Sequence, residues 1–509
     1  MTPMNTPPDP GTLALPAHRR YDSVASVWSD LENTLVCSEW CLIELMIANN
    51  LWVGPPPTAQ PPPDYQTEGS LEYGVFLFLI HNPGKITISL DWEVIAALVA
   101  AALELPPSNM TGPSYDNLSG QKLAAADGSM VGTEQFDLYD QYWIVALYNM
   151  IMTVINGNYY NNDILPVPAL DTYEPVTITS QTGQNVIKVG LLGDWGTGGQ
   201  AAAQVMSTLV AANPDCLIHL GDVYYSGAPQ TDPTGDYTAL GEEQDRLVSP
   251  WPSGYEGRSF ALNSNHEMYC GAQGFFNDAL LAQGTAFGAQ NGYSMFALKV
   301  GDWTLLGLDS AYNGTSLDLF MYGNLGSAQN GPAVTQIQWI QNLKLDPAKT
   351  IVLTHHTGFD FDCSTATQSK FAPFWQQVRG ALGGDPYAWY WGHVHNGIVY
   401  TNPVKIASSP TFTTNTYCRC LGHGALPFGV ATGLQVGANN VEWFATAREA
   451  SVNGVDLVYN GCVGLAFVLD GQNNVASITE FFINTDPDPS PFVKRIFGTS
   501  DAAAEAKFS

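Results

Sequence analysis

The pattern of apolar and polar positions changes character near residue 186. From there to residue 483, short apolar runs rich in β-branched residues alternate with amphipathic stretches and polar turns. Such runs predict strands, and apolar positions at a spacing of 3.6 residues predict helices. Strands are predicted at 186–192, 216–220, 258–263, 293–300, 303–308, 350–354, 387–391 and 404–408, helices at 200–212, 333–345 and 370–382, and a closing hairpin at 463–469 and 475–483. This alternation predicts an α/β domain over residues 186–485.

The first 185 residues follow a different pattern. Helix-like spacing occurs at 22–53, 92–105 and 138–155, with a strand-like stretch at 73–80 and a Pro-rich run at 55–63. Residues 166–180 are interpreted as a linker or an edge strand. We therefore predict a mainly helical ancillary region over residues 1–185, which contains no cluster of chemically active residues and whose role is unknown.

Two segments of the carboxyl-terminal half carry no clear strand or helix pattern. Residues 417–433 are rich in Cys and Gly and are predicted to form a loop. Residues 486–509 begin with a run of Pro and Asp and are predicted to be a disordered tail.

The charge of the chain limits its partners. With 18 Lys and Arg against 47 Asp and Glu, the formal net charge is -29. This field repels nucleic acid, so binding through a broad basic face is not expected. An anionic substrate would need local positive charge, most simply from a bound metal. The eight cysteines show no zinc-ribbon spacing, and both free thiols and disulfides stay open.

Neither export by a signal peptide nor membrane insertion is predicted. The first twenty residues lack the continuous apolar segment of a secretory signal, so a cytoplasmic location or export without such a signal is expected. The most apolar stretches, 92–105 and 142–155, are too short to cross a bilayer and are interpreted as buried helices. The oligomeric state is not constrained by the sequence.

Five short motifs carry candidate chemistry, and each follows a predicted strand. They are GDWG at 193–196, GDVYY at 221–225, NHE at 265–267, THH at 354–356 and GHVH at 392–395, and they hold five of the nine histidines. Open α/β sheets gather ligands at the carboxyl ends of their strands, so these motifs are expected to meet at one edge. Carboxylate, imidazole and amide oxygen ligands suit two borderline or hard metal ions.

These motifs resemble those of the calcineurin-like metallophosphoesterase superfamily and, within it, the purple acid phosphatases. Asp194 is followed by Trp195 and Gly196 rather than by the DxH pattern of most superfamily members, and Tyr225 stands three residues after Asp222. The resemblance covers residues 186–483. It implies an α/β fold in which four layers, α-β-β-α, form a sandwich.

The resemblance also implies the site residues. One metal, ferric iron in the family, would be held by Asp194, Tyr225, His395 and the shared Asp222, and a second, divalent ion of iron, zinc or manganese by Asn265, His355, His393 and again Asp222. His266 and His356 would be catalytic, contacting phosphate or protonating the leaving oxygen. Glu267 belongs to the motif without being an expected ligand.

The implied activity is hydrolysis of phosphate monoesters by in-line attack of a metal-activated hydroxide, with a small phosphorylated substrate. Phosphodiesters, nucleotides and pyrophosphate are alternative substrates of the same centre. A non-catalytic binding protein on the same scaffold is the alternative from another class. Its signature would be missing ligands, whereas all seven implied ligands are present.

A few positions depart from the family pattern or have a second interpretation. Ser264 stands where the family usually has Gly, so a different backbone angle is expected at this turn. His219 is interpreted as structural. His423 is interpreted as a residue of the following loop that could line the pocket, and Tyr224 either lines the site or packs in the core.

Overall fold

The computed structural model describes residues 157–499 with gaps at 233, 236, 238, 315–319, 327–333, 360–371, 407–411, 427, 430–433, 439, 446–455, 458 and 486–490. It also describes four residues of the predicted helix at 138–155, and all four are helical: Ala146, Asn149, Met150 and Thr153. The other elements predicted for the first 145 residues, and with them the mainly helical character of that region, lie outside the described residues.

A six-stranded sheet carries the first three motifs. Its strand order is β18-β17-β16-β2-β3-β4, where β2, β3 and β4 are parallel and the others antiparallel. The strands are β2 (Val186–Leu192), β3 (Cys216–His219), β4 (Ser259–Ala261), β16 (Gly461–Leu469), β17 (Val475–Asn484) and β18 (Phe492–Gly498). Strand β2 is one of the sheet's inner strands and is buried along nearly its whole length, as its continuous apolar sequence predicts.

An eight-stranded sheet carries the two histidine motifs. Its order is β1-β5-β6-β7-β8-β12-β9-β14, with β6, β7, β8 and β12 parallel. The strands are β1 (Val176–Thr177), β5 (Phe296–Val300), β6 (Trp303–Gly307), β7 (Thr350–Thr354), β8 (Ala388–Trp391), β9 (Gly397–Tyr400), β12 (Tyr417–Leu421) and β14 (Val441–Phe444).

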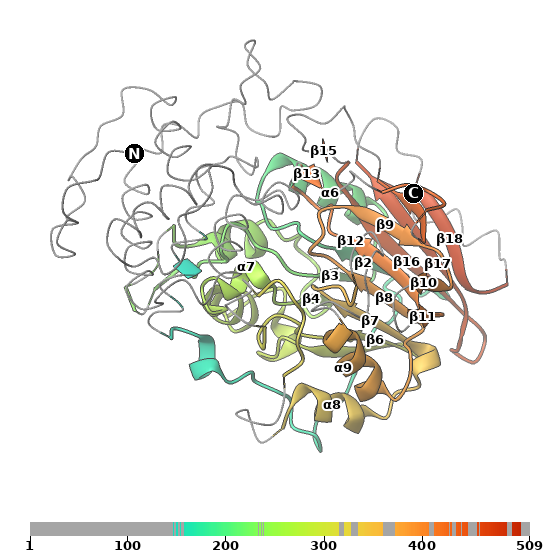
Figure 1. Ribbon diagram of the computed structural model, residues 1–509, viewed down its shortest axis with the longest axis horizontal. Coiled ribbons are helices and arrows are strands. Elements are labelled where there is room, and N and C mark those ends of the chain that lie inside the picture. Colours follow the sequence, from blue (N-terminus) through green and yellow to red (C-terminus); the bar gives the residue numbers. More distant parts are fainter. Residues whose placement is uncertain are drawn as a thin grey trace, which may run out of the picture. The chain divides into compact units, whose positions relative to one another are not determined.

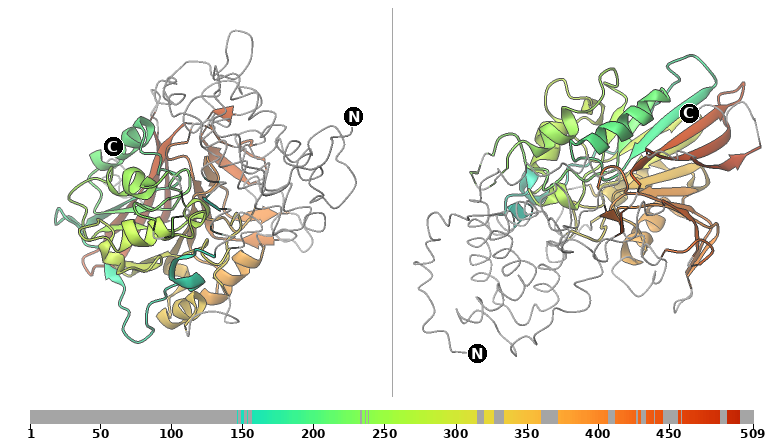
Figure 2. Two further views of the ribbon diagram at one scale, coloured as in Figure 1. Left: turned by 90° about the vertical axis from the view of Figure 1, so that its left-hand side faces the viewer. Right: turned by 90° about the horizontal axis from the view of Figure 1, so that it is seen from above.

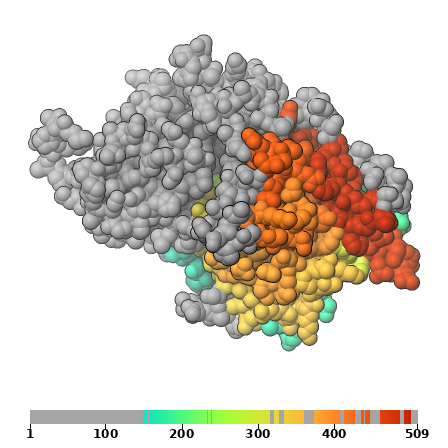
Figure 3. All heavy atoms as spheres, turned by 45° about the vertical axis from the view of Figure 1, so that its right-hand side comes forward, coloured from blue at the N-terminus to red at the C-terminus, as the bar shows by residue number. Residues whose placement is uncertain are grey.

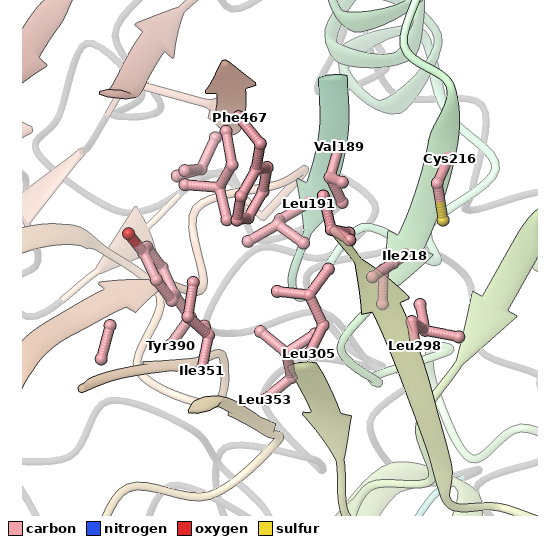
Figure 4. Close-up of a cluster of buried hydrophobic side chains, with 14 of the residues drawn as sticks. Val189, Leu191, Cys216, Ile218, Leu298, Leu305, Ile351, Leu353, Tyr390 and Phe467 are labelled. Carbon is pink, nitrogen blue, oxygen red and sulfur yellow. The ribbon is translucent and has the colours of Figure 1, made fainter. Parts of the chain in front are cut away.

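The two sheets pack face to face around one apolar core. Figure 4 shows side chains of both sheets pointing toward one another, among them Leu191 and Ile218 from the six-stranded sheet and Leu305 and Ile351 from the other. All four are fully buried. Burying such a side chain stabilises the fold by about 1.5–3 kcal/mol, so this shared core fixes the two sheets, and the motifs at their ends, against each other.

Helices cover the outer faces of both sheets (Figures 1 and 2). Helix α6 (Gln200–Ala211) buries Ala202, Val205, Met206 and Leu209, a 3.6-residue stripe that packs over β2. On the other face lie α8 (Gln336–Leu343), which begins with a capping box at Thr335, and α9 (Ala372–Leu382), whose Trp375 stacks on Trp389 of β8. The layers are therefore α-β-β-α, and the predicted fold class is confirmed.

The remaining elements are short. Helix α7 (Asn265–Met268) follows β4, and two small ladders pair β10 (Val404–Ile406) with β11 (Phe412–Thr414) and β13 (Phe428–Gly429) with β15 (Asp456–Leu457). Single turns of 3₁₀ helix occur at Tyr160–Asp163, Gly288–Gln290 and Pro347–Lys349, and of π-helix at Gln244–Val248 and Phe275–Leu280. No helix within the described ranges is both long and apolar enough to cross a membrane.

The structure differs from the sequence prediction at two places. Residues 417–421 of the predicted loop form β12, an inner strand of the eight-stranded sheet. Residues 492–498 of the predicted tail form the edge strand β18, so the expectation of disorder is wrong there; Figure 3 shows these last strands in red at the surface. Residues 166–180 include the edge strand β1, which is one of the two interpretations given for them, and the compact unit that holds both sheets begins at Tyr159.

His219 lies on β3, and its side chain is fully buried. Neither ring nitrogen has a hydrogen-bond partner among the described residues, which is unusual for a buried polar group. Its ring packs against Trp195 and Trp251. Burial lowers the pKa of His219 to about 3, so the folded protein keeps it neutral. His423 is likewise fully buried, with its pKa lowered to about 4 by burial, which leaves it in the packing beside Phe482.

Acid is therefore expected to destabilise the fold through His219. The unfolded chain binds a proton below a pKa of about 6.5 while the folded protein does not, so stability falls as pH decreases from there, by roughly 1.4 kcal/mol per pH unit for each such histidine. His219→Phe, which loses no hydrogen bond that the structure gives the ring, should remove roughly 2–3 kcal/mol of the loss between pH 7 and pH 4.5. Urea unfolding of both proteins across this range measures the difference, and parallel pH profiles would contradict it.

Candidate metal centre

The five motifs meet at the carboxyl ends of strands from both sheets. Asp194 follows β2, Asp222 follows β3 and Asn265 follows β4, while the paired histidines follow β7 and β8. Nitrogen and oxygen atoms of Asp194, Asp222 and His355 lie within 4.8 Å of one another, as do those of the group His355, His356 and His393. His355 belongs to both groups, so they form one continuous cluster.

One part of the cluster, here called the second site, contains Asp222, Asn265, His355 and His393. His355 Nε2 lies 2.8 Å from Asn265 Oδ1, 3.2 Å from His393 Nδ1 and 3.2 Å from Asp222 Oδ1. His355 Nδ1 lies 2.9 Å from the carbonyl oxygen of Leu220, to which it donates its hydrogen. This contact leaves a lone pair on Nε2, directed at the other three side chains.

The atoms that converge at the second site are acceptors, which is the chemistry of a cation site. The amide nitrogen of Asn265 faces the Tyr269 hydroxyl at 3.2 Å, so its oxygen faces the histidines. Burial lowers the pKa of His355 to about 3 and that of His393 to about 4, although the charge of Asp222 acts in the opposite direction. Both rings are therefore neutral near pH 7, and a divalent ion can bind them without displacing protons.

The other part of the cluster, here called the first site, contains Asp194, Asp222, Tyr224 and His395. The Tyr224 hydroxyl lies 2.9 Å from Asp222 Oδ2, 3.4 Å from Asp194 Oδ1 and 3.3 Å from His395 Nε2. His395 Nε2 also lies 3.5 Å from Asp194 Oδ1. Burial first, and then the charge of Asp222, raise the pKa of Asp194 well above its usual range. Two buried carboxylates that repel each other fit a site that holds a cation.

The phenol at the first site is that of Tyr224, one residue before the predicted Tyr225. Tyr225 donates its backbone N–H to Glu242, accepts a contact from His266 at its carbonyl oxygen, and has its ring under the Arg246 guanidinium, 5.0 Å away. In this structure the hydroxyl that lies among the first-site atoms is therefore that of Tyr224, and the ligand role of Tyr225 stays a prediction.

Glu242 and Arg246 hold the backbone of the loop after β3, which contains Tyr224 and Tyr225. The Glu242 carboxylate accepts hydrogen bonds from the backbone N–H groups of Tyr225 and Ser226, at 2.8 and 2.9 Å. Arg246 donates to the Tyr224 carbonyl oxygen and forms an ion pair with Glu242 at 3.3 Å. Nothing in the GDVYY motif itself shows these partners, which lie about twenty residues further along the chain.

Three of the predicted ligands have a backbone conformation that non-glycine residues rarely adopt. Asp194, Asp222 and His393 have φ values of 55°, 75° and 66°. Left-handed backbone costs free energy in such residues and is concentrated at functional sites. Gly221, with φ of 100°, lies so close to His355 that a Cβ would be 2.9 Å from its Nδ1, so this turn requires glycine.

The two predicted catalytic histidines border the cluster. His266 Nδ1 lies 2.6 Å from the Tyr225 carbonyl oxygen, and its Nε2 lies 3.9 Å from Asp222 Oδ2. His356 Nδ1 lies 2.9 Å from the Ser310 hydroxyl, while its Nε2 has no hydrogen-bond partner among the described residues. Burial lowers the pKa of His356 well below its usual range. Each ring is held by its Nδ1 and leaves Nε2 for other contacts.

Ser264 departs from the family pattern without the expected change of backbone. Its φ and ψ, -135° and -176°, are ordinary extended values, and its hydroxyl accepts the His266 N–H at the start of α7. The same hydroxyl is hydrogen-bonded to the carboxylates of Asp222 and Glu267. Because burial and the Asp222 charge raise the pKa of Glu267 to about 8, Glu267 can donate to Ser264 while Ser264 donates to Asp222.

Comparison with known proteins gives one family match and two distant solved structures. Residues 187–397 match the profile of the family described as calcineurin-like phosphoesterase. No curated protein matches the chain. Two solved structures are similar. One, titled "GAP50 the anchor in the inner membrane complex of Plasmodium", has 9% identity and a TM-score of 0.39 over 64% of this chain and 93% of its own chain. The other, titled "Structure of PhoD", has 11% identity and a TM-score of 0.35 over 66% of this chain and 74% of its own chain.

At these TM-scores the two structures are too distant to bear on fold or function. The family match stands on its own, because its 187–397 range contains all five motifs and ends just after the last of them. The α-β-β-α layers and the buried acceptor cluster agree with it. Residues 187–397 are therefore similar to a calcineurin-like phosphoesterase domain, and the buried cluster of possible metal ligands lies within this range.

Proposed function

We propose that this chain is a phosphatase that hydrolyses small phosphate monoesters at a dinuclear metal centre of the purple acid phosphatase kind. One observation carries the proposal: the side chains of the first and second sites gather into two sets that share Asp222. Six of the seven predicted ligands are members, and Tyr224 supplies the phenol. Asp194, Tyr224 and His395 would hold ferric iron, and Asn265, His355 and His393 a divalent iron, zinc or manganese ion.

Bound metal ions would supply Lewis acidity, polarising the phosphoryl group and lowering the pKa of water. The chain's own residues supply orientation and proton transfer. His266, held through Nδ1 at the Tyr225 carbonyl, presents Nε2 on the Asp222 side of the cluster. His356 is oriented by Ser310, and when that hydroxyl donates to Nδ1, the ring hydrogen is on Nε2 and can be given to a phosphate or leaving oxygen.

Access to the centre runs past the two histidines of the GHVH motif. His393 and His395 are partly exposed, and the His395 side chain retains 20% of its accessible surface, whereas Asp194 and His355 are fully buried. Substrate would therefore approach over these rings. Because the chain as a whole is strongly acidic, the metal ions would provide the positive charge that an anionic phosphate needs.

Purified full-length protein is expected to hold close to two metal ions per chain and to hydrolyse an aryl phosphate once loaded with iron, zinc or manganese. Removing the ions with a chelator should abolish activity, and adding them back should restore it, because the proposed ligands are neutral or anionic near pH 7. Elemental analysis and a panel of monoesters, diesters, nucleotides and pyrophosphate measure both. Absence of metal and of activity after reconstitution would refute the proposal, and a preference for diesters would correct the substrate.

The iron-loaded protein is expected to be coloured, since a phenolate bound to ferric iron absorbs visible light. Burial and the two aspartates raise the pKa of Tyr224 well above its usual range, so only a strong cation would deprotonate it. Tyr224→Phe should therefore remove the absorption band. Tyr225→Phe is the matched control and should keep it. Loss of the band in Tyr225→Phe alone would return the ligand role to Tyr225.

A further inference from the structure

Ser264 connects the start of α7 to the carboxylate that both proposed sites share. Its side chain is fully buried, and its hydroxyl is hydrogen-bonded to Asp222 Oδ1. The other oxygen of that carboxylate, Oδ2, receives the Tyr224 hydroxyl at 2.9 Å. Each oxygen of Asp222 thus has one hydroxyl neighbour from the chain itself. Because a Tyr224 phenolate bound to metal has no hydrogen to donate, the Ser264 hydroxyl would be the one of these two donors that remains in the metal-bound protein.

The packing around Ser264 leaves this contact little freedom. A Cβ on Gly221, the residue before Asp222, would lie 2.7 Å from the Ser264 Cβ, so the serine fills the space that the glycine leaves. Asp222 has left-handed backbone, and its Oδ1 lies 3.2 Å from His355 Nε2 at the second site. A rotation of the carboxylate would therefore move the oxygen that faces His355.

We propose that Ser264 is a positioning residue, which orients Asp222 through the hydrogen bond to Oδ1 and thereby strengthens the binding of a divalent ion at the second site. The inference rests on the proposed function and assigns a role to a residue outside the predicted ligand set. Partners that orient a metal ligand typically change metal affinity by about 10- to 100-fold when removed. A hydrogen-bonded, pre-oriented carboxylate also binds an ion without first losing rotational freedom.

The alternative is that Ser264 only caps α7, through the contact at 3.1 Å from the His266 N–H. The two roles respond differently to substitution. Glycine is nearly as good a helix cap as serine, and alanine is much worse, but both lack the hydroxyl. Both variants lose the hydrogen bonds to Asp222 and Glu267, so the cap is reported by the difference between them: Ser264→Ala should be less stable than Ser264→Gly. Metal affinity should be lowered to the same extent in both, because neither has the hydroxyl.

The experiment titrates chelator-treated full-length protein with Zn²⁺ alone and with Mn²⁺ alone, by calorimetry, and measures urea unfolding of the same samples. Ser264→Gly and Ser264→Ala are expected to bind the weaker ion about 10- to 100-fold less tightly, and Ser264→Thr, which keeps a hydroxyl, within about threefold of wild type. The inference, but not the proposed function, would be overturned by a folded Ser264→Gly protein with wild-type metal affinity, or by a Ser264→Thr protein whose metal affinity is as low as that of Ser264→Gly. A wild-type protein that binds neither ion would overturn the proposed function as well.

Discussion

Asp222→Asn is expected to lower kcat/KM for an aryl phosphate by at least about 10³-fold and to lower the metal content below two ions per chain. The substitution removes the negative charge that both sites share. The new amide nitrogen would also face an unsuitable neighbour in either orientation. At the position of Oδ1 it would meet the Ser264 hydroxyl and His355, which lies 3.2 Å away, and at the position of Oδ2 it would meet the Tyr224 hydroxyl. One substitution therefore disturbs both sites at once.

Asp215→Asn is the matched control, since Asp215 lies at the opposite, amino end of the same strand β3 and is also buried. Its carboxylate accepts the backbone N–H groups of Gln181 and Lys188 at 2.6 and 2.8 Å, remote from the cluster. The same chemical change there should cost stability without changing the activity of the folded fraction. Activity measured per folded protein, together with elemental analysis, separates the two cases. Retention of a tenth or more of the activity by Asp222→Asn would place the chemistry elsewhere.

The gathering of most predicted ligands in one cluster could be expected from the sequence, because each of them belongs to a short motif at the end of a strand. The apolar runs before Asp194, Asp222 and His355 fix where the strands β2, β3 and β7 end. Parallel pairing then brings the ends of β2 and β3 to one edge. The end of β7 lies in the other sheet, and its proximity depends on the apolar core that both sheets share.

Which tyrosine hydroxyl lies at the first site could not be predicted in the same way, because it depends on the loop after β3. Tyr224 and Tyr225 are chemically equal neighbours, and Glu242 and Arg246 hold the loop backbone from a distant segment. Spacing within a motif carries no information about such partners. Ser264 is similar: its role depends on where Asp222 lies, although its departure from the usual glycine was visible in the sequence.

Strand β12 was missed for a related reason. Its sequence, Tyr-Cys-Arg-Cys-Leu, contains an arginine in the middle of an inner strand, and a charged residue there argues against burial when the sequence is considered alone. Arg419 is nevertheless fully buried, since Glu480 of β17 neutralises it across the core. The partner lies 61 residues away in the other sheet. Strand β18 was missed because the Pro/Asp run before it resembles the start of a disordered tail.

The Arg419–Glu480 pair connects the two sheets, and breaking it is expected to have the largest effect on stability. Arg419 Nε and Nη2 donate to Glu480 at 2.7–2.9 Å, and Nη1 donates to the carbonyl oxygens of Tyr400 and Cys418. The Tyr390 hydroxyl adds a hydrogen bond to Glu480 at 2.7 Å. Both charged side chains have no exposed surface, so each depends on the other for compensation.

Glu480→Gln should therefore lower the free energy of unfolding by about 3–5 kcal/mol, because it leaves the guanidinium buried without a counter-charge. Replacing both partners by apolar residues, as in the double variant Arg419→Met with Glu480→Leu, should cost much less, since two desolvated charges are removed together. Urea unfolding of both variants at pH 7 measures the difference. Lys494→Ala is the control, because it removes a charged side chain that is partly exposed, on the neighbouring edge strand β18. Two results would contradict this prediction: a loss of unfolding free energy below about 1 kcal/mol in Glu480→Gln, or a double variant as unstable as the single one. Either result would mean that the pair is not the electrostatic connection between the sheets and that the burial of Arg419 in β12 has another cause.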